Sequence, residues 1–342
     1  MSFAVSRARE PEAGASLIEA VVALGLSLAL AAGLFTLVAP VQSLTRSLPE
    51  LADVSQRMRY GFNRLHRDLR DVGYGLDDQS TIAPSGVWLP VLVPYRLGLR
   101  APSAPHRAAG SSSLSLLRRA AGSSSRLTAS LVDGPSPEVA LEPRPGCGPT
   151  CGYGVGDLVL ISDDQGRWEI FRVRGRAASS LSLDRLHPTR TAFAPGARVR
   201  RVHLDHYYRD AARDQLRHYD GWRADFPLVE GVAAFRIRLL AVQVASSEPC
   251  QSTSGDAVHA LVELEWSALG DGPWCGPAEH PRDADLRRVR AVHVTLRMQA
   301  GDAYRGRDPR LFAMPGRVAL AHHQVPDLTL GFRVTPPNLG GP

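Results

Sequence analysis

The sequence predicts an α+β protein, with a long N-terminal α-helix that is first hydrophobic and then amphipathic, followed by a β-rich globular head. Two observations support this fold class. The chain is almost entirely apolar from Leu17 to Val38, and from Val41 to Val72 apolar residues recur at helical spacing. Beyond Gly75, turn residues are dense and short apolar runs alternate with them, which is typical of strands.

These changes of character divide the chain. Residues 1–14 form a short polar leader, 15–75 a transmembrane and stalk helix, 76–335 the head, and 336–342 a tail expected to be frayed. A bilayer core about 30 Å thick needs about 20 helical residues, and Leu17–Val38 supplies them. The alternative is a secretory signal peptide, which has a shorter apolar core and a small-residue cleavage site that "FTLVAPVQS" resembles weakly.

The amphipathic part predicts that one face of the helix packs against the head. Arginines and acids fill the opposite face. We expect one continuous helix from about Ala15 to Val72, kinked or locally broken at Pro40 and Pro49 and ended by Gly73–Gly75. The apolar stripe consists of Val41, Leu44, Leu48, Leu51, Val54, Met58, Phe62, Leu65, Leu69 and Val72.

Within the head the clearest element is a hairpin, in which Val159–Ile161 and Trp168–Val173 flank the turn "DDQG". Longer strands are predicted at 229–242, 257–269 and 289–300. The segment Ala101–Arg126 is rich in Ala, Ser, Gly and Arg, and is expected to be an exposed loop around one strand.

The charge pattern excludes some functions. All 40 basic residues are arginine, so no lysine nucleophile, Schiff base or P-loop lysine is available. The net charge of +6 is spread thinly along the chain, which favours a solvated surface, and we predict no specific nucleic-acid partner.

Four cysteines fall in two local pairs, Cys147 with Cys151 and Cys250 with Cys275. In a membrane-anchored chain this favours disulfides formed in an oxidising compartment, with the connectivity left open. Free thiols and a zinc site are the alternatives, and the spacing does not match a zinc finger.

No convincing catalytic motif is present. There is no HExxH or GxSxG, and the glycine-rich stretch 151–157 lacks GxGxxG spacing. "HLDHYYRD" (203–210) is better explained as a half-solvated strand, with His203 and Asp205 on one face and His206 and Tyr208 on the other, than as a metal site. We predict a protein that is not an enzyme and that binds no cofactor or metal.

The leader and the apolar run resemble the cleavage and methylation segment of type IV prepilins. The match consists of Gly14, then "ASLIEAVVALGLSLALAAGLF", with Glu19 the fifth residue after the glycine. In that family a dedicated peptidase cuts after the glycine on the cytoplasmic side and methylates the new terminus. The resemblance implies cleavage between Gly14 and Ala15 and methylation of Ala15, although the family usually has phenylalanine there and a more basic leader.

A carboxylate at the depth of Glu19 costs about 2.5–3.5 kcal/mol on insertion scales, so it normally has a partner. Cleavage would create an ammonium group at Ala15. The resemblance therefore implies that Glu19 pairs with the N-terminus of a neighbouring subunit. The alternative is that Glu19 reaches the cytoplasmic headgroups.

A second resemblance covers "MRYGFNRLHRDLRDVGYG" (58–75), which is similar to the helix end of PilW-type minor pilins. "GDLVLISD", "FPLVEGVAAFRIRLL" and "RRVRAVHVTLRM" resemble head segments of the same group. Together these features imply a minor pilin of a type IV pilus that primes filament assembly and lies at or near the tip. The alternatives are a J-like type II secretion pseudopilin and an anchored periplasmic enzyme or binding protein.

The resemblance also implies a location and partners. The precursor would lie in the inner membrane with its N-terminus in the cytoplasm and its head in the periplasm, and later in the pilus at the cell surface. Its partners would be the prepilin peptidase, and other minor and major pilins through the N-terminal helix.

Overall fold

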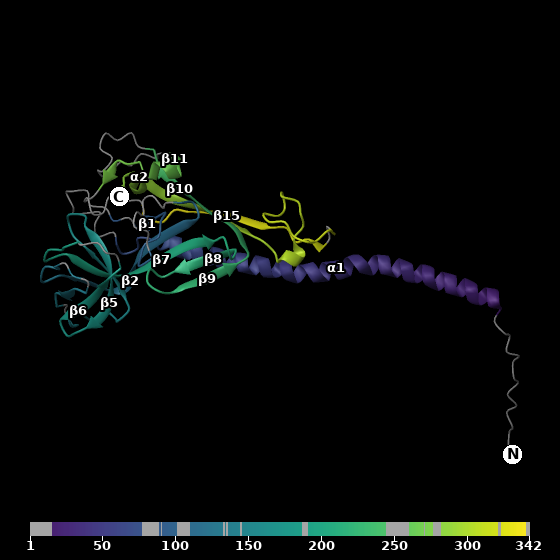
Figure 1. Ribbon diagram of the computed structural model, residues 1–342, viewed down its shortest axis with the longest axis horizontal. Helices are drawn as coiled ribbons and strands as arrows, with labels where there is room; N and C mark the ends of the chain where they lie inside the picture. Colours follow the sequence, from purple (N-terminus) through teal and green to yellow (C-terminus); the bar gives the residue numbers. More distant parts are fainter. Residues whose placement is uncertain are drawn as a thin grey trace, which may run out of the picture.

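The computed structural model has an α+β architecture, in which one long N-terminal helix carries a strand-rich head at its C-terminal end (Figure 1). The structure describes residues 16–76, 89, 91–100, 110–132, 134, 136–143, 146–186, 191–243, 260–269, 271–275, 282–320 and 323–339.

Helix α1 spans Leu17–Arg70, a length of 54 residues or about 80 Å. It is helical through both Pro40 and Pro49, so the predicted local break is wrong. Each proline removes one backbone donor, and the hydrogen bonds on either side keep the helix continuous. The rod curves gently without an interruption (Figure 1).

Two glycines with positive φ turn the chain out of α1 as predicted, at Gly73 (φ 72°) and Gly75 (φ 68°). The Gly73 amide donates to the Leu117 carbonyl oxygen at 2.9 Å. The predicted frayed tail also meets this turn, because the Asn338 side chain donates to the Val72 carbonyl oxygen at 3.1 Å. Residues 336–339 therefore dock on the helix end, which corrects the prediction for this part of the tail, while 340–342 lie outside the described residues.

The described strands of the head form two main sheets. The larger is antiparallel, with the order β1-β2-β7-β4-β5-β6-β3, while β8 pairs with β7 and β9 with β8. Its strands are β1 (Leu92–Val93), β2 (Ser113–Arg126), β3 (Glu138–Ala140), β4 (Leu158–Ser162), β5 (Trp168–Arg176), β6 (Ser180–Arg185), β7 (Arg198–Asp210), β8 (Gln215–Tyr219) and β9 (Asp225–Glu230).

The second sheet has the order β11-β10-β14-β15, also antiparallel. It consists of β10 (Val232–Val242), β11 (Leu261–Glu263), β14 (Val289–Met298) and β15 (Leu328–Val334). The short strands β12 (Trp274–Cys275) and β13 (Arg282–Asp283) pair beside it. The remaining short elements are α2 (Asp285–Arg288), η3 (Trp266–Leu269) and η4 (Asp302–Tyr304).

The C-terminal part of α1 packs against β9, β14 and β15 and thereby joins the two sheets. A side chain at Gly61 would lie 3.0 Å from Val229 of β9 and 3.4 Å from Leu296 of β14, so this glycine allows the close approach. On the neighbouring face Phe62 contacts Phe332 of β15 edge to face, with ring centroids 4.7 Å apart.

The head has two hydrophobic cores. The larger contains the buried face of α1 and side chains of both sheets. The smaller lies in a distal lobe built on β3–β6, at the end of the molecule farthest from the N-terminus (Figure 1). Its buried residues include Tyr153, Phe171 and Phe193.

The predicted apolar stripe is buried only where the head covers it. Val54, Met58, Leu65, Leu69 and Val72 lie in the larger core. Leu48 and Leu51 are exposed, which corrects that part of the prediction, and the side chains of Val41 and Leu44 are outside the description.

The hairpin prediction is confirmed, since β4 and β5 pair across the "DDQG" turn. The strand expected within Ala101–Arg126 is present as the long strand β2. It takes up more of the segment than expected and carries the buried Leu114, Leu116 and Leu117, while 101–109 lie outside the described residues. The strand predicted at 257–269 needs correction. The described part of the predicted strand 257–269 contains three strand residues, β11, and then the 3₁₀ turn η3.

Candidate functional site

The N-terminal part of α1 is apolar on every side and makes no buried contact with the head. Leu17–Thr36 is long and apolar enough to cross a membrane, with a mean hydropathy of 2.2, and none of it is buried within the protein. Successive residues point about 100° apart, so the exposed large side chains cover the whole circumference. They are Leu17, Ile18, Val21, Val22, Leu24, Leu26, Leu28, Leu30, Leu34 and Phe35.

Such a surface needs a non-aqueous environment, because each large apolar side chain gains about 1.5–3 kcal/mol on leaving water. A helix that is hydrophobic all round is stable in lipid or among other helices. This part of the chain is therefore long and apolar enough for a membrane anchor, and a cleaved signal sequence satisfies the same test of length and composition.

Glu19 lies in the first turn of α1 and is exposed. Its backbone amide donates to the Ser16 carbonyl oxygen at 2.9 Å. A carboxylate in the first turn interacts favourably with the helix dipole, so Glu19 is locally compatible with a helix that otherwise excludes charge. Gly14 and Ala15, the predicted processing residues, lie outside the described residues.

The predicted disulfide partners are partly described. Cys147 and Cys151 form a disulfide, with Cα atoms 5.8 Å apart. Thr150 anchors the loop, since its hydroxyl donates to the Ala177 carbonyl oxygen at 2.9 Å. Cys275 is also disulfide-bonded, and Cys250 lies outside the described residues.

A buried polar cluster joins α1 to the central strand β7, and we call it the junction network. It consists of Arg64, Asp68, Arg118, Asp205, Tyr207 and His218. The sequence predicts that Asp68 lies on the polar face of the helix, yet only 1% of its surface is exposed. One signal in the sequence could have indicated this burial. Asp68 lies three residues after the buried Leu65, and residues at that spacing lie on the same side of a helix.

Each carboxylate in the junction network has several partners. Arg64 Nε lies 2.7 Å from Asp68 Oδ2, and the Tyr207 hydroxyl donates to the same oxygen. Asp205 accepts from Arg118 Nε at 3.1 Å and lies 2.7 Å from His218 Nε2. The network thus joins one helix to three strands, β2, β7 and β8, through two buried carboxylates whose arginine partners are partly exposed.

The pKa values agree with this arrangement. Burial raises the pKa of Asp205, but the hydrogen bond from His218 and the charges of Arg118 and Arg64 outweigh it, so the pKa falls below its usual value. Burial and the neighbouring charges of Asp205 and Asp68 raise the pKa of Tyr207 far above its usual value. The Asp205 carboxylate therefore stays charged and the Tyr207 phenol stays protonated near neutral pH, so both serve as fixed hydrogen-bonding partners.

His206 lies on the opposite face of β7 from Asp205, as the predicted strand alternation requires. Its Nδ1 is 2.9 Å from the Ser115 hydroxyl, which donates to the Tyr95 carbonyl oxygen at 2.6 Å. The predicted half-solvated character is wrong for the middle of this strand, because all residues from Leu204 to Tyr207 are buried, while His203 is exposed and 208–210 are partly exposed. Burial, with a contribution from the Arg96 cation, lowers the pKa of His206 to about 3.

We therefore expect the head to lose stability in mild acid. The unfolded chain binds a proton on His206 below about pH 6.5 and the folded chain does not, so the stabilisation present above that pH is lost as the pH falls toward 3. The free energy of unfolding should fall by about 2 kcal/mol between pH 6.5 and pH 5. Urea unfolding of the detergent-solubilised chain, followed by tryptophan fluorescence, measures it.

The matched variant is His206→Gln, which keeps a polar side chain but does not titrate. The difference in unfolding free energy between the native chain and this variant should shrink by about 2 kcal/mol over the same pH range. A constant difference would contradict the assignment of the acid sensitivity to His206.

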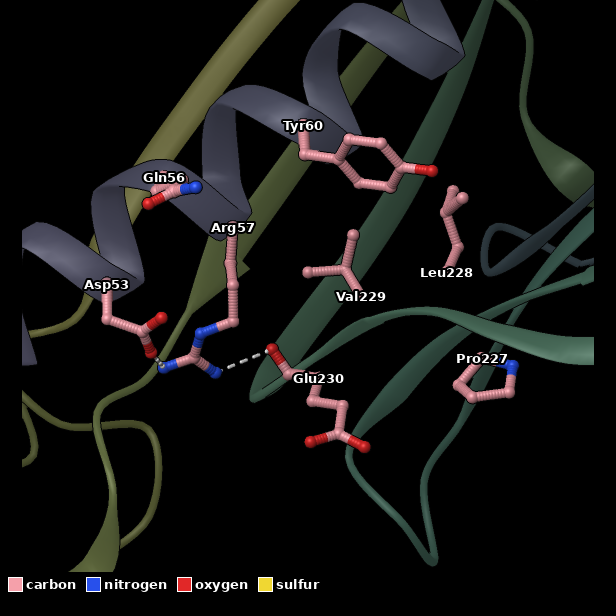
Figure 2. Close-up of a pocket in the computed structure, with 8 residues that line it drawn as sticks. All are labelled: Asp53, Gln56, Arg57, Tyr60, Pro227, Leu228, Val229 and Glu230. Carbon is pink, nitrogen blue, oxygen red and sulfur yellow. Dashed lines mark hydrogen bonds and ion pairs between the residues drawn. The ribbon is translucent and has the colours of Figure 1, made fainter.

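A shallow groove of about 400 Å³ runs between α1 and β9. Figure 2 shows Arg57 reaching across it, with Nη2 2.8 Å from Asp53 Oδ2 and Nη1 donating to the Glu230 carbonyl oxygen at 3.0 Å. Tyr60, Leu228 and Val229 supply its apolar wall. The lining contains no histidine, cysteine or serine, so the groove offers no nucleophile and base pair.

Within the described residues, no group of three or more His, Cys, Asp and Glu side chains is placed to hold a metal ion. The sequence matches no protein-family model, and a search of curated proteins finds no related chain. The functional evidence therefore comes from the molecule alone, and its two strongest features are the exposed apolar half of α1 and the charged junction that fixes the other half to the head.

Proposed function

We propose that the chain is a minor subunit of a type IV pilus, which primes filament assembly and lies at or near the filament tip. The observation that carries the proposal is the single continuous helix, of which one half is exposed and apolar while the other half is built into the head. An anchor alone would work with a flexible linker to the head. A rigid helix instead fixes the position of the head relative to a bundle formed by the apolar halves of neighbouring subunits, as assembly of a filament requires.

Glu19 supports the same proposal. In lipid the carboxylate is costly, and the exposed first turn leaves it accessible to a partner. If the peptidase cuts after Gly14, the new ammonium of a neighbouring subunit can neutralise it when the helices leave the membrane and pack side by side. The proposed partners are the prepilin peptidase and other pilins, and the proposed path runs from the inner membrane to the pilus.

N-terminal sequencing tests the proposal. The protein from cells with an active prepilin peptidase should begin at Ala15, and the protein from peptidase-deficient cells should begin at or before Gly14. The processed form should co-purify with sheared pili. A terminus after Val38 in both strains would show a cleaved signal sequence, and co-purification with a secretion system alone would contradict the pilus assignment.

A further inference from the structure

The segment Asp302–Leu320, which we call the arm, projects from the head beside the stalk. It follows β14 and precedes β15, and it extends farther toward the N-terminal end of α1 than the other described parts of the head (Figure 1). Its root is fixed to the stalk, because the Gly301 amide donates to Glu50 Oε1 at 2.7 Å. The arm therefore lies between the head and the apolar half of α1.

The arm has little regular secondary structure but is held firmly. Phe312 is its buried anchor, with an exposed fraction of 2%. The Ala313 amide donates to Asp327 Oδ2 at 2.7 Å, and the same oxygen lies 2.8 Å from Arg297 Nε on β14. Backbone hydrogen bonds from Gly316 to Gly306 and from Val318 to Arg305 close the loop on itself.

Apolar side chains nevertheless face the solvent on this arm. Leu311 and Met314 are each 42% exposed and Leu320 is 55% exposed. Arg307 and Arg310 are exposed beside them and have no ion-pair partner among the described residues. Apolar side chains flanked by arginines are typical of surfaces that settle at the interface of a bilayer containing anionic lipids.

The position of the arm fits this interface. The apolar span ends near Thr36, and Glu50 lies fourteen residues farther on, or about 21 Å along the axis. The headgroup layer occupies about 5–8 Å of that distance. The root of the arm lies beside Glu50 and the arm extends from there toward the span. A helix tilt of about 20° brings one side of the head closer to the bilayer.

We propose that the arm rests on the headgroup layer of the bilayer that α1 spans, with Leu311, Met314 and Leu320 at the interface and Arg307 and Arg310 against lipid phosphates. The contact fixes the tilt of the stalk before assembly. This inference rests on the membrane anchorage in the proposed function and is independent of filament formation.

Lipid quenching tests the contact in the full-length chain reconstituted in nanodiscs. The described cysteines are all disulfide-bonded, so an added cysteine can be labelled with an environment-sensitive fluorophore. Met314→Cys is the test position. Val155→Cys is the control, because Val155 is 66% exposed and lies before β4 on the distal side of the head. Lipids spin-labelled at the headgroup should quench the label at 314 about threefold more than the label at 155.

Charge reversal at the two arginines tests their contact with lipid phosphates. Arg307→Glu with Arg310→Glu should reduce quenching at 314 in nanodiscs that contain phosphatidylglycerol, and should change it little in phosphatidylcholine alone. Equal quenching at 314 and 155 would overturn the lipid contact. Protection of the label at 314 that requires added pilin subunits and not lipid would show a protein interface instead.

A third label separates this inference from the proposed function. Leu30→Cys reports whether α1 inserts, through quenching by lipids spin-labelled deep in the acyl chain. Quenching at 30 without quenching at 314 overturns the arm contact alone. No quenching at 30 overturns the anchorage, and with it both the arm contact and the proposed membrane precursor.

Discussion

Replacement of Asp205 by alanine is expected to lower the free energy of unfolding by about 2–3 kcal/mol, the largest effect we predict on stability. The variant removes the ion pair with Arg118 at 3.1 Å and the contact with His218 at 2.7 Å, and among the described residues Arg118 keeps only its longer contact of 3.7 Å with Asp68. Removal of one member of a charge pair is costly where the other stays shielded from water, and Arg118, with 23% of its side chain exposed, is partly shielded. Urea unfolding of the detergent-solubilised chain at pH 7, followed by tryptophan fluorescence, measures the change.

The control for Asp205→Ala is Asp53→Ala, which removes a carboxylate of α1 that lies outside the junction network. Asp53 also pairs with an arginine, Arg57, at 2.8 Å, but its side chain is 59% exposed. Exposed pairs contribute about 0–1 kcal/mol, so this variant should remain close to the native chain. Equal losses for the two variants would contradict the role of the junction network in joining the stalk to the head.

The pH dependence of the Asp205 effect follows from its lowered pKa. The carboxylate is stabilised in the folded state, so its contribution is present above the unfolded pKa of about 3.9 and is lost as the pH falls through the folded pKa. The difference between the native chain and Asp205→Ala should therefore be constant near neutral pH and shrink below about pH 4. His206 changes stability over a higher pH range, between its folded-state pKa of about 3 and its unfolded pKa of about 6.5.

Local patterns in the sequence predicted the parts of the fold that depend on neighbours along the chain. The α1 helix, its buried stripe from Val54 to Val72 and the β4–β5 hairpin follow from spacing and turn residues. The position where the stripe becomes exposed could not be predicted, because it depends on how far the head extends along the helix. Leu48 and Leu51 have the same chemistry as Val54 but no sheet covers them.

The junction network depends on contacts between distant parts of the chain. Asp68 and Tyr207 are 139 positions apart, yet they share a hydrogen bond. On the sequence alone Asp68 fits the charged face of the helix, and Asp205 fits a strand that faces water on one side. The packing of α1 across β7 buries both carboxylates and brings Arg118 of β2 within 3.7 Å of Asp68, whereas the Arg64–Asp68 pair lies within the helix itself. The arm is a similar case, since turn-rich sequence alone does not show which side chains face outward.

Replacement of Glu19 by alanine is expected to leave membrane insertion intact and to lower incorporation into filaments by about tenfold or more. Insertion depends on the apolar length of Leu17–Thr36, which the variant leaves unchanged while removing a carboxylate from it. Incorporation, under the proposed function, depends on a charge pair in an apolar interior, and a loss of about 1.4 kcal/mol already changes an equilibrium tenfold. Immunoblots of the membrane fraction and of sheared filaments measure the two quantities separately.

Two further variants show whether the charge itself matters. Glu19→Gln keeps the size and polarity of the side chain but cannot neutralise an ammonium group, so it should behave like Glu19→Ala. Ser27→Ala changes a polar residue in the same apolar half. Among the described residues the Ser27 hydroxyl bonds only within the helix, to the Ala23 carbonyl oxygen at 2.8 Å, so incorporation should be unchanged. Normal incorporation of Glu19→Gln would instead place the carboxylate at the headgroups, where its charge needs no neighbouring subunit.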